Sequence, residues 1–210
     1  MTDALTLPRL HVVGDSISIQ YGVFLEPMLA GVMAYSRKGG KASDGDEANA
    51  GDSSMVVDYL KSIGETVRLP FEYLMVNCGL HDIKRQLPAE EIQIPLGLYV
   101  ENLREIVVLS RRISKTLVWV RTTPVVDQIH NHLGMQFHRY AADANAYNKA
   151  ADKIMKSEGV PTIDLFTFTE NLGASIYCDH VHFVDSVRAQ QAAFIAGHLY
   201  PRLRSGYTAQ

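Results

Sequence analysis

The chain has 210 residues, of which 47% are hydrophobic and 20% are charged, and its net charge is −3 at pH 7. These values are typical of a globular protein with one sizeable core, so we expect residues 1–210 to form a single domain. The slightly acidic balance gives no basic surface for nucleic acid or anionic membranes. No apolar run approaches the ~20 residues of a membrane span, and the N-terminal segment lacks a signal-peptide core. The composition therefore favours a cytoplasmic enzyme or binding protein.

The cysteine content supports the same expectation. Cys78 and Cys178 are the only cysteines, which is too few for a disulfide scaffold and suits a reducing compartment. Whether the two pair depends on how the fold places them.

In chain order, short apolar segments alternate with segments that repeat apolar residues at helical spacing. Strands are predicted at 10–14, 32–36, 71–79, 116–124 and 160–165. Helices are predicted over 19–31 with Pro27 bending it, from Asp52 or Ser53 onward, around 99–110, over 140–159, and from Asp185 or Ser186 to Pro201. A polar, glycine-rich loop covers 37–54. This alternation predicts a three-layer α/β/α domain with a mostly parallel sheet. We expect the five strands to have the flavodoxin-like order 2-1-3-4-5.

The first predicted strand runs directly into a serine, in the segment VVGDSISIQYG at residues 12–22. Ligands of open α/β sheets bind at the carboxyl ends of the strands, which makes Ser16 a candidate nucleophile. The alternative interpretation is that Asp15 or Ser16 only caps the following helix.

A serine hydroxyl needs a base to take its proton and a third group to orient that base. The segment YCDHVHF, residues 177–183, offers Asp179 and His182 three residues apart, just before the last helix. In a parallel sheet this loop emerges at the edge where Ser16 lies, so the three side chains can meet. The alternatives are a loop-stabilising hydrogen bond or a metal site that includes His180.

An acyl-transfer site also needs donors for the oxyanion. The backbone N–H of Ser16 opens a helix and is one candidate. Gly51 in NAGDSS, residues 49–54, is a second, because glycine lets the backbone approach closely. The segment NCGLHDIK, residues 77–84, supplies a third: its Gly79 permits a tight turn and its His81 projects a ring N–H.

These four segments resemble, in the right order, the four sequence blocks of the SGNH or GDSL hydrolase superfamily. The resemblance spans residues 12–183 and implies an esterase with Ser16 as nucleophile and oxyanion donor. It further implies that Gly51 is a second donor and that Asp179 and His182 complete a catalytic triad.

One position departs from this pattern, because His81 stands where the superfamily has an oxyanion-donating asparagine. A neutral imidazole with its N–H turned inward can fill that role. The alternatives are that His81 contacts substrate instead, or that Asn77 or a loop amide replaces the missing donor.

Other polar residues are interpreted more simply. We expect Asp15 and Asp82 to be structural carboxylates and Trp119 to be a core residue. His130 and His138, with His132, fall in a polar loop after the fourth strand, and we interpret them as solvated residues that contact substrate at the mouth of the site. Arg121, near a strand's carboxyl end, is a further candidate for substrate binding. No zinc-ligand spacing, phosphate loop or dinucleotide motif occurs, so no metal or cofactor is expected.

The sequence thus predicts a serine esterase that cleaves short-chain esters, O-acetyl groups on a carbohydrate foremost, without a cofactor. Its expected partner is a small-molecule or glycan ester, and we expect no binding to nucleic acid or membranes. The sequence leaves open whether the protein forms a homo-oligomer. The alternatives are a lysophospholipase- or thioesterase-like acylhydrolase, a metal-dependent hydrolase using Asp179, His180 and His182, and a non-catalytic carbohydrate-binding relative.

Overall fold

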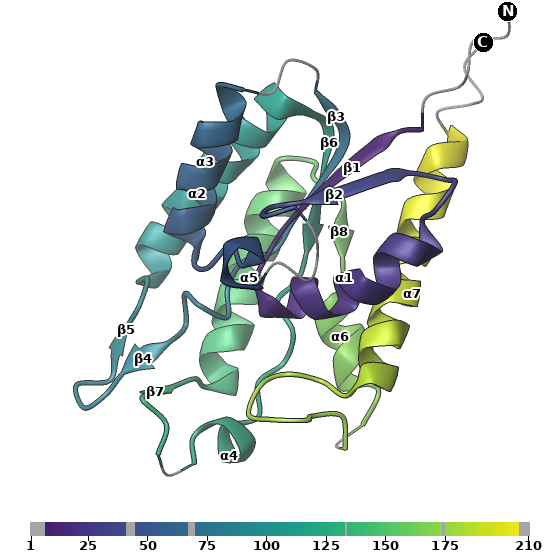
Figure 1. The fold of residues 1–210 in the computed structure, drawn as a ribbon. Coiled ribbons are helices and arrows are strands. Elements are labelled where there is room, and N and C mark those ends of the chain that lie inside the picture. The colour runs from purple at the N-terminus through teal and green to yellow at the C-terminus, as the bar shows by residue number, and fades with distance from the viewer. Residues whose placement is uncertain (1–6, 41–44, 67–69, 133, 174, 206–210) are drawn as a thin grey trace, which may run out of the picture.

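The computed structural model describes residues 7–40, 45–66, 70–132, 134–173 and 175–205. Its main sheet has five strands in the order β2-β1-β3-β6-β8, and every neighbouring pair is parallel (Figure 1). The strands are β1 (Arg9–Val13), β2 (Ala34–Arg37), β3 (Phe71–Val76), β6 (Ser114–Val120) and β8 (Thr162–Ile163). Numbered along the chain, these five strands have the predicted order 2-1-3-4-5.

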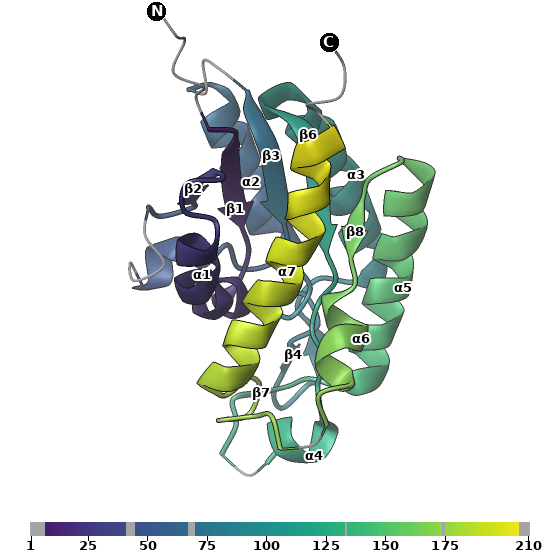
Figure 2. The same ribbon diagram turned by 90° about the vertical axis from the view of Figure 1, so that its right-hand side faces the viewer.

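Helices cover both faces of the sheet and complete three layers (Figure 1, Figure 2). On one face α1 (Ser16–Met28) packs against α7 (Asp185–Ser205), which also contacts α6 (Leu165–Glu170). On the other face α3 (Leu96–Ile113) packs between α2 (Ser53–Gly64) and α5 (Ala141–Ser157). Trp119 on β6 is fully buried, as predicted. In the described part of the chain, no helix combines the length and apolar character needed to cross a membrane.

Aspartates at two strand-to-helix connections determine where the helices near the site begin. Asp15 caps α1, and its Oδ1 accepts from the Ile17 N–H at 3.1 Å. The helix therefore begins at Ser16 rather than at residue 19. Pro27 lies near the end of the helix, so the helix before it is regular. Asp52 caps α2 in the same way, accepting from the N–H groups of Ser54 and Met55.

The last helix corrects the prediction that Pro201 ends it. α7 continues to Ser205, because a proline removes one backbone hydrogen bond but its φ fits a helix. The Tyr200 hydroxyl donates to Met28 O at 2.7 Å and holds this part of α7 against the end of α1.

A second, three-stranded sheet was not predicted. It has the order β5-β4-β7, with β4 (Arg85–Gln86), β5 (Glu91–Ile92) and β7 (Phe137–His138), and α4 (Asp127–His130) lies just before β7. Strands of two residues carry no periodicity that a sequence could reveal. The long loop 37–54 likewise contains the short 3-10 helix η1 (Gly45–Ala48), and α6 replaces the end of the strand predicted at 160–165.

Candidate active site

Three side chains predicted to act together form a continuous hydrogen-bonded chain. Ser16 Oγ lies 2.8 Å from His182 Nε2, and His182 Nδ1 lies 2.7 Å from Asp179 Oδ2. With the ring proton on Nδ1, His182 donates to the carboxylate and accepts the serine hydroxyl proton through Nε2. The arrangement provides an alcohol, a base within reach of its proton, and a carboxylate that orients the base.

The loop that carries Asp179 and His182 is fixed by its own hydrogen bonds. The Cys178 N–H donates to His182 O at 2.9 Å, and Asp179 Oδ1 accepts from the N–H groups of Val181 and His182 at 2.8 and 2.7 Å. Partial burial alone would raise the pKa of Asp179, but these backbone donors and the His182 ring outweigh it and lower the pKa to about 2. The carboxylate therefore stays ionised at neutral pH.

Ser16 occupies the first position of α1, directly after the cap Asp15, which is 1% exposed. The first N–H groups of a helix have no partner within it and carry partial positive charge. Within the described residues the Ser16 N–H has no acceptor, so it is available to an oxyanion. The Ala50 N–H donates to Gly14 O at 3.0 Å and brings the loop that contains Gly51 to the same end of β1.

Gly51 has the backbone conformation expected of a close-approach glycine, with φ at +69°. A Cβ there would lie 2.4 Å from Met55 Sδ. Its N–H, however, donates to the side-chain oxygen of Asn49 at 2.9 Å. Asparagine side chains commonly accept a hydrogen bond from the backbone two residues further on. The N–H that we predicted to bind the oxyanion is therefore already hydrogen-bonded to Asn49.

His81 follows a turn that requires a glycine. Gly79 has φ at +151°, and a Cβ would lie 2.3 Å from Thr122 Oγ1. Burial and the positive charges of Lys84 and Arg139 lower the pKa of His81 to about 3. The ring is therefore neutral at ordinary pH, which is the state that can donate one N–H and accept at the other nitrogen.

Comparison with solved structures places this arrangement in a known fold, although no family model and no curated protein matches the sequence. A lipase/acylhydrolase from Enterococcus faecalis has 13% identity, a TM-score of 0.67, and coverage of 93% of this chain and 97% of its own. A G-D-S-L lipolytic protein from Veillonella parvula has 13% identity, a TM-score of 0.63, and coverage of 90% and 96%. A variant acetyl xylan esterase from Geobacillus stearothermophilus has 16% identity, a TM-score of 0.61, and coverage of 94% and 95%.

The chain has the SGNH (GDSL) hydrolase fold. This confirms the fold that the four sequence segments implied. In this SGNH fold, the segments that contain Ser16, Gly51 and His81 all follow the carboxyl ends of main-sheet strands, and the loop with His182 lies beside them.

Two residues predicted to bind substrate, Asn77 and Arg121, make contacts within the protein. The Asn77 side-chain N–H donates to Val120 O at 2.9 Å and ties β3 to β6. Arg121 pairs with Asp164 at 2.6 Å and with Asp152 at 3.2 Å. These contacts join strands and helices of the domain, and the substrate-binding role of the two residues stays a prediction.

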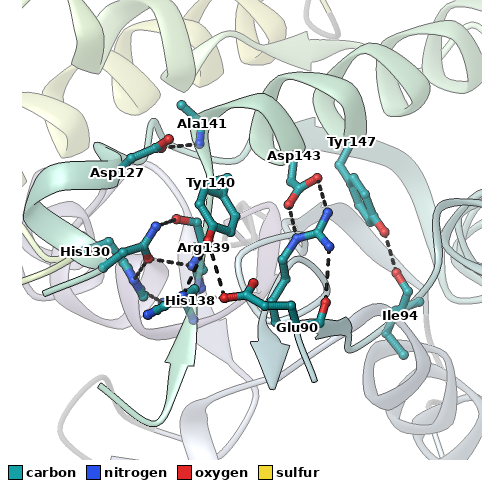
Figure 3. A network of polar contacts seen from close by, with 12 residues as sticks. Glu90, Ile94, Asp127, His130, His138, Arg139, Tyr140, Ala141, Asp143 and Tyr147 are labelled. Atoms are coloured by element: carbon teal, nitrogen blue, oxygen red, sulfur yellow. Dashed lines mark hydrogen bonds and ion pairs between the residues drawn. The ribbon is translucent and has the colours of Figure 1, made fainter. Parts of the chain in front are cut away.

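The prediction that His130 is solvated is also wrong, because this side chain is 0% exposed. Its Nδ1 lies 3.0 Å from Asn131 Oδ1, and its Nε2 lies 2.8 Å from an Arg139 guanidinium nitrogen (Figure 3). The short helix α4 turns His130 inward onto that guanidinium. The His138 side chain is also hydrogen-bonded within the protein, because its Nδ1 lies 2.6 Å from Glu90 Oε1.

Arg139 is the residue near the site that sequence reasoning missed. It is 4% exposed, its Nε donates to Leu80 O at 2.5 Å, and its guanidinium lies 4.9 Å from the centre of the Phe137 ring. The bond to Leu80 fixes the residue that precedes His81. Nothing in the sequence HRY distinguishes this arginine from a surface one, since the Leu80 carbonyl that it binds lies 59 positions away in the chain.

The alternative metal site at the C-terminal loop receives no support from the geometry. Both ring nitrogens of His182 are hydrogen-bonded, to Ser16 and to Asp179. Among the residues that the structure describes, no three His, Cys, Asp or Glu side chains are grouped so that they could hold a metal ion. The two cysteines, whose pairing the sequence left open, are both free thiols: Cys78 is buried and Cys178 is exposed.

Proposed function

We propose that this protein is a serine esterase that hydrolyses short-chain carboxylic esters through an acyl-enzyme. The observation that carries the proposal is the chain of hydrogen bonds from Ser16 Oγ to His182 at 2.8 Å and on to Asp179 at 2.7 Å. The fold supports it, because the similar structures include a lipase/acylhydrolase and an acetyl xylan esterase.

In the proposed mechanism Ser16 Oγ attacks the ester carbonyl carbon while His182 Nε2 takes the hydroxyl proton. Asp179 stabilises the imidazolium that forms. The oxyanion accepts from the Ser16 N–H and from the His81 ring, and the Gly51 N–H joins them when its bond to Asn49 gives way. The imidazolium then protonates the leaving alcohol. Water, deprotonated by His182, attacks the acyl carbon and releases the acid and the free serine.

For the substrate, we propose an O-acetyl ester of a carbohydrate. The comparison includes an acetyl xylan esterase, which supports an acetyl group on a sugar. The strands β4 and β5, which follow the His81 turn, and β7, which precedes Arg139, are short and carry ion-paired side chains, which favours a polar alcohol over a long acyl chain.

A fluorophosphonate probe and a chain-length series test this function. We expect mass spectrometry to find the label on the Ser16 peptide of the wild type, and we expect none on Ser16→Ala. Ser186→Ala, at an exposed serine, is the matched control and keeps both label and turnover. We expect p-nitrophenyl acetate and acetylated sugars to be hydrolysed faster than p-nitrophenyl palmitate.

Each alternative function gives a different result. A strong palmitate preference with Ser16 labelled indicates a lysophospholipase- or thioesterase-like enzyme. Turnover that chelators abolish, without labelling, indicates a metal-dependent hydrolase. Binding of glycans without any turnover indicates a non-catalytic relative.

A further inference from the structure

The turn that carries His81 also carries a lysine, Lys84, that pairs with no carboxylate in the described part of the chain. The Lys84 N–H donates to His81 O at 3.3 Å, and Lys84 O accepts from the Gln93 N–H at 2.7 Å, so the backbone of this lysine is fixed. Its ammonium lies 4.9 Å from the centre of the Phe137 ring. Lys84 is half-buried, and buried lysines are usually paired with a carboxylate.

In the described part of the chain, no carboxylate forms an ion pair with Lys84. The carboxylates whose charge reaches it are Asp52 and Asp15, and both accept backbone hydrogen bonds as helix caps. Burial and the charge of Arg139 lower the pKa of Lys84. A partly desolvated cation that lacks an anion is costly for the protein unless a ligand supplies the anion.

A series of ring contacts connects Lys84 to the reacting groups. The Phe137 ring, against which the ammonium lies, is 6.5 Å from the His180 ring, and His180 is 6.2 Å from His182. His180 Nδ1 is buried and has no hydrogen-bond partner. Lys84 also lies close enough to His81 for its charge to lower the pKa of that ring. Lys84 is thus connected to the triad histidine through the Phe137 and His180 rings, and its charge acts on the His81 ring.

We propose that Lys84 is a specificity-determining residue that binds a carboxylate group of the ester substrate. The inference rests on the proposed esterase function and narrows its substrate class to acidic esters. Phe137 holds the ammonium in place, and a substrate carboxylate replaces the water lost on burial with a charge-assisted hydrogen bond. The carboxylate belongs either to the alcohol part, as in an acetylated acidic sugar, or to a dicarboxylic acyl group.

Two matched ester pairs test the proposal and distinguish these sources. One pair is 4-acetoxybenzoate and its neutral methyl ester, with the charge on the alcohol part. The other is p-nitrophenyl hemisuccinate and p-nitrophenyl butyrate, with the charge on the acyl part. For each pair the readout is the charged-to-neutral ratio of kcat/KM, compared between wild type and variant. Effects of a variant on folding, and the intrinsic reactivities of the esters, cancel in this comparison.

We expect Lys84→Met to lower this ratio about tenfold or more for one pair, mainly through KM, because a hydrogen bond to a charged group is lost. Lys84→Arg keeps most of the preference. Lys156→Met, at an exposed lysine in the last turn of α5, is the matched control and leaves the ratio unchanged. The pair that responds identifies the part of the substrate that carries the carboxylate.

A ratio that is the same in the wild type and in Lys84→Met for both pairs overturns the proposal, and if Ser16 is still labelled the esterase function survives. Loss of labelling together with the absence of any turnover overturns the esterase function instead. The two failures are therefore distinguishable.

Discussion

Two regions border Ser16, and different interactions hold them in place. At the end of β1, backbone hydrogen bonds and the helix caps Asp15 and Asp52 fix the chain within a few residues of each group. The other region, formed by β4, β5, α4 and β7, is held by charged side chains (Figure 3). Its bonds from Arg139 to Leu80 and from Arg85 to Asp143 join residues 59 and 58 positions apart. In the first region the helix caps act locally, but the contact between Ser16 and His182 joins residues 166 positions apart. The second region depends on long-range bonds of charged side chains.

The largest expected effect concerns the region at the end of β1. Ser16→Ala and His182→Ala remove the nucleophile and the base, and we expect kcat to fall by roughly 10⁴–10⁶. Asp179→Asn keeps the shape but favours the wrong tautomer of His182, with an expected loss of roughly 10²–10⁴. Steady-state kinetics measure these losses, and circular dichroism checks that each variant is folded. A wild-type rate in Asp179→Asn would contradict the role assigned to that carboxylate.

The next effect lies where the two regions meet, at Asp82. Its Oδ1 accepts from the Ser53 N–H at 3.0 Å, its backbone oxygen accepts from the Ile94 N–H, and it is 0% exposed. Burial, reinforced by the charge of Asp52 and opposed by the Ser53 hydrogen bonds, raises the pKa of Asp82 to about 7.

Between pH 4 and 7 the folded protein therefore holds a proton that the unfolded chain has released, so the free energy of unfolding falls as the pH rises through this window. Asp82→Asn keeps an acceptor for Ser53 and removes this dependence. Relative to the wild type, we expect the free energy of unfolding of the variant to rise by about 4 kcal/mol between pH 4 and 8. Urea unfolding measures the difference, and a difference that does not change with pH would be evidence against the buried, protonated carboxyl.

The third prediction asks whether His81 acts through its neutral ring. We expect His81→Ala to lower kcat about a hundredfold, as expected for loss of one oxyanion donor, while His81→Asn keeps substantial activity. Because the pKa of His81 is about 3, its protonation does not shape the pH–rate profile above pH 5. Equal losses in the two variants would show that His81 is not an oxyanion donor.

The difference between the two regions also explains how much the sequence could predict. The meeting of Ser16 with His182 could be predicted, because Ser16 follows a recognisable strand, Asp179 and His182 are three residues apart, and the strand ends of a parallel sheet share one edge. The strand order is an expectation of the flavodoxin-like fold class and not of any local pattern. The burial of His130 could not be predicted, because no pattern in the sequence shows that α4 turns this ring onto the Arg139 guanidinium. The hydrogen bond from the Gly51 N–H to Asn49 joins two residues of the segment NAGDSS. It depends on the rotamer of the Asn49 side chain, which the sequence does not give. The catalytic roles themselves stay predictions until activity is measured.

The smallest expected effect tests how strongly charge holds the second region. Arg85 and Asp143 form two hydrogen bonds, of 2.7 and 3.0 Å, and their side chains are 31% and 17% exposed. Two parallel bonds in a partly buried place are expected to couple by about 1 kcal/mol, more than an exposed pair. A double-mutant cycle with Arg85→Met and Asp143→Asn, followed by urea unfolding, measures this coupling.

The pair Arg111 and Glu158, 2.9 Å apart with side chains 55% and 37% exposed, is the matched control. We expect its coupling to be only a few tenths of a kcal/mol and to vanish in 1 M salt, where screening acts within about 3 Å. The Arg85 coupling should largely survive that salt, because the partly buried pair is less accessible to ions. If both couplings are equally small and equally screened, the ion pair does not hold β4 against α5, and backbone pairing alone must position the second region.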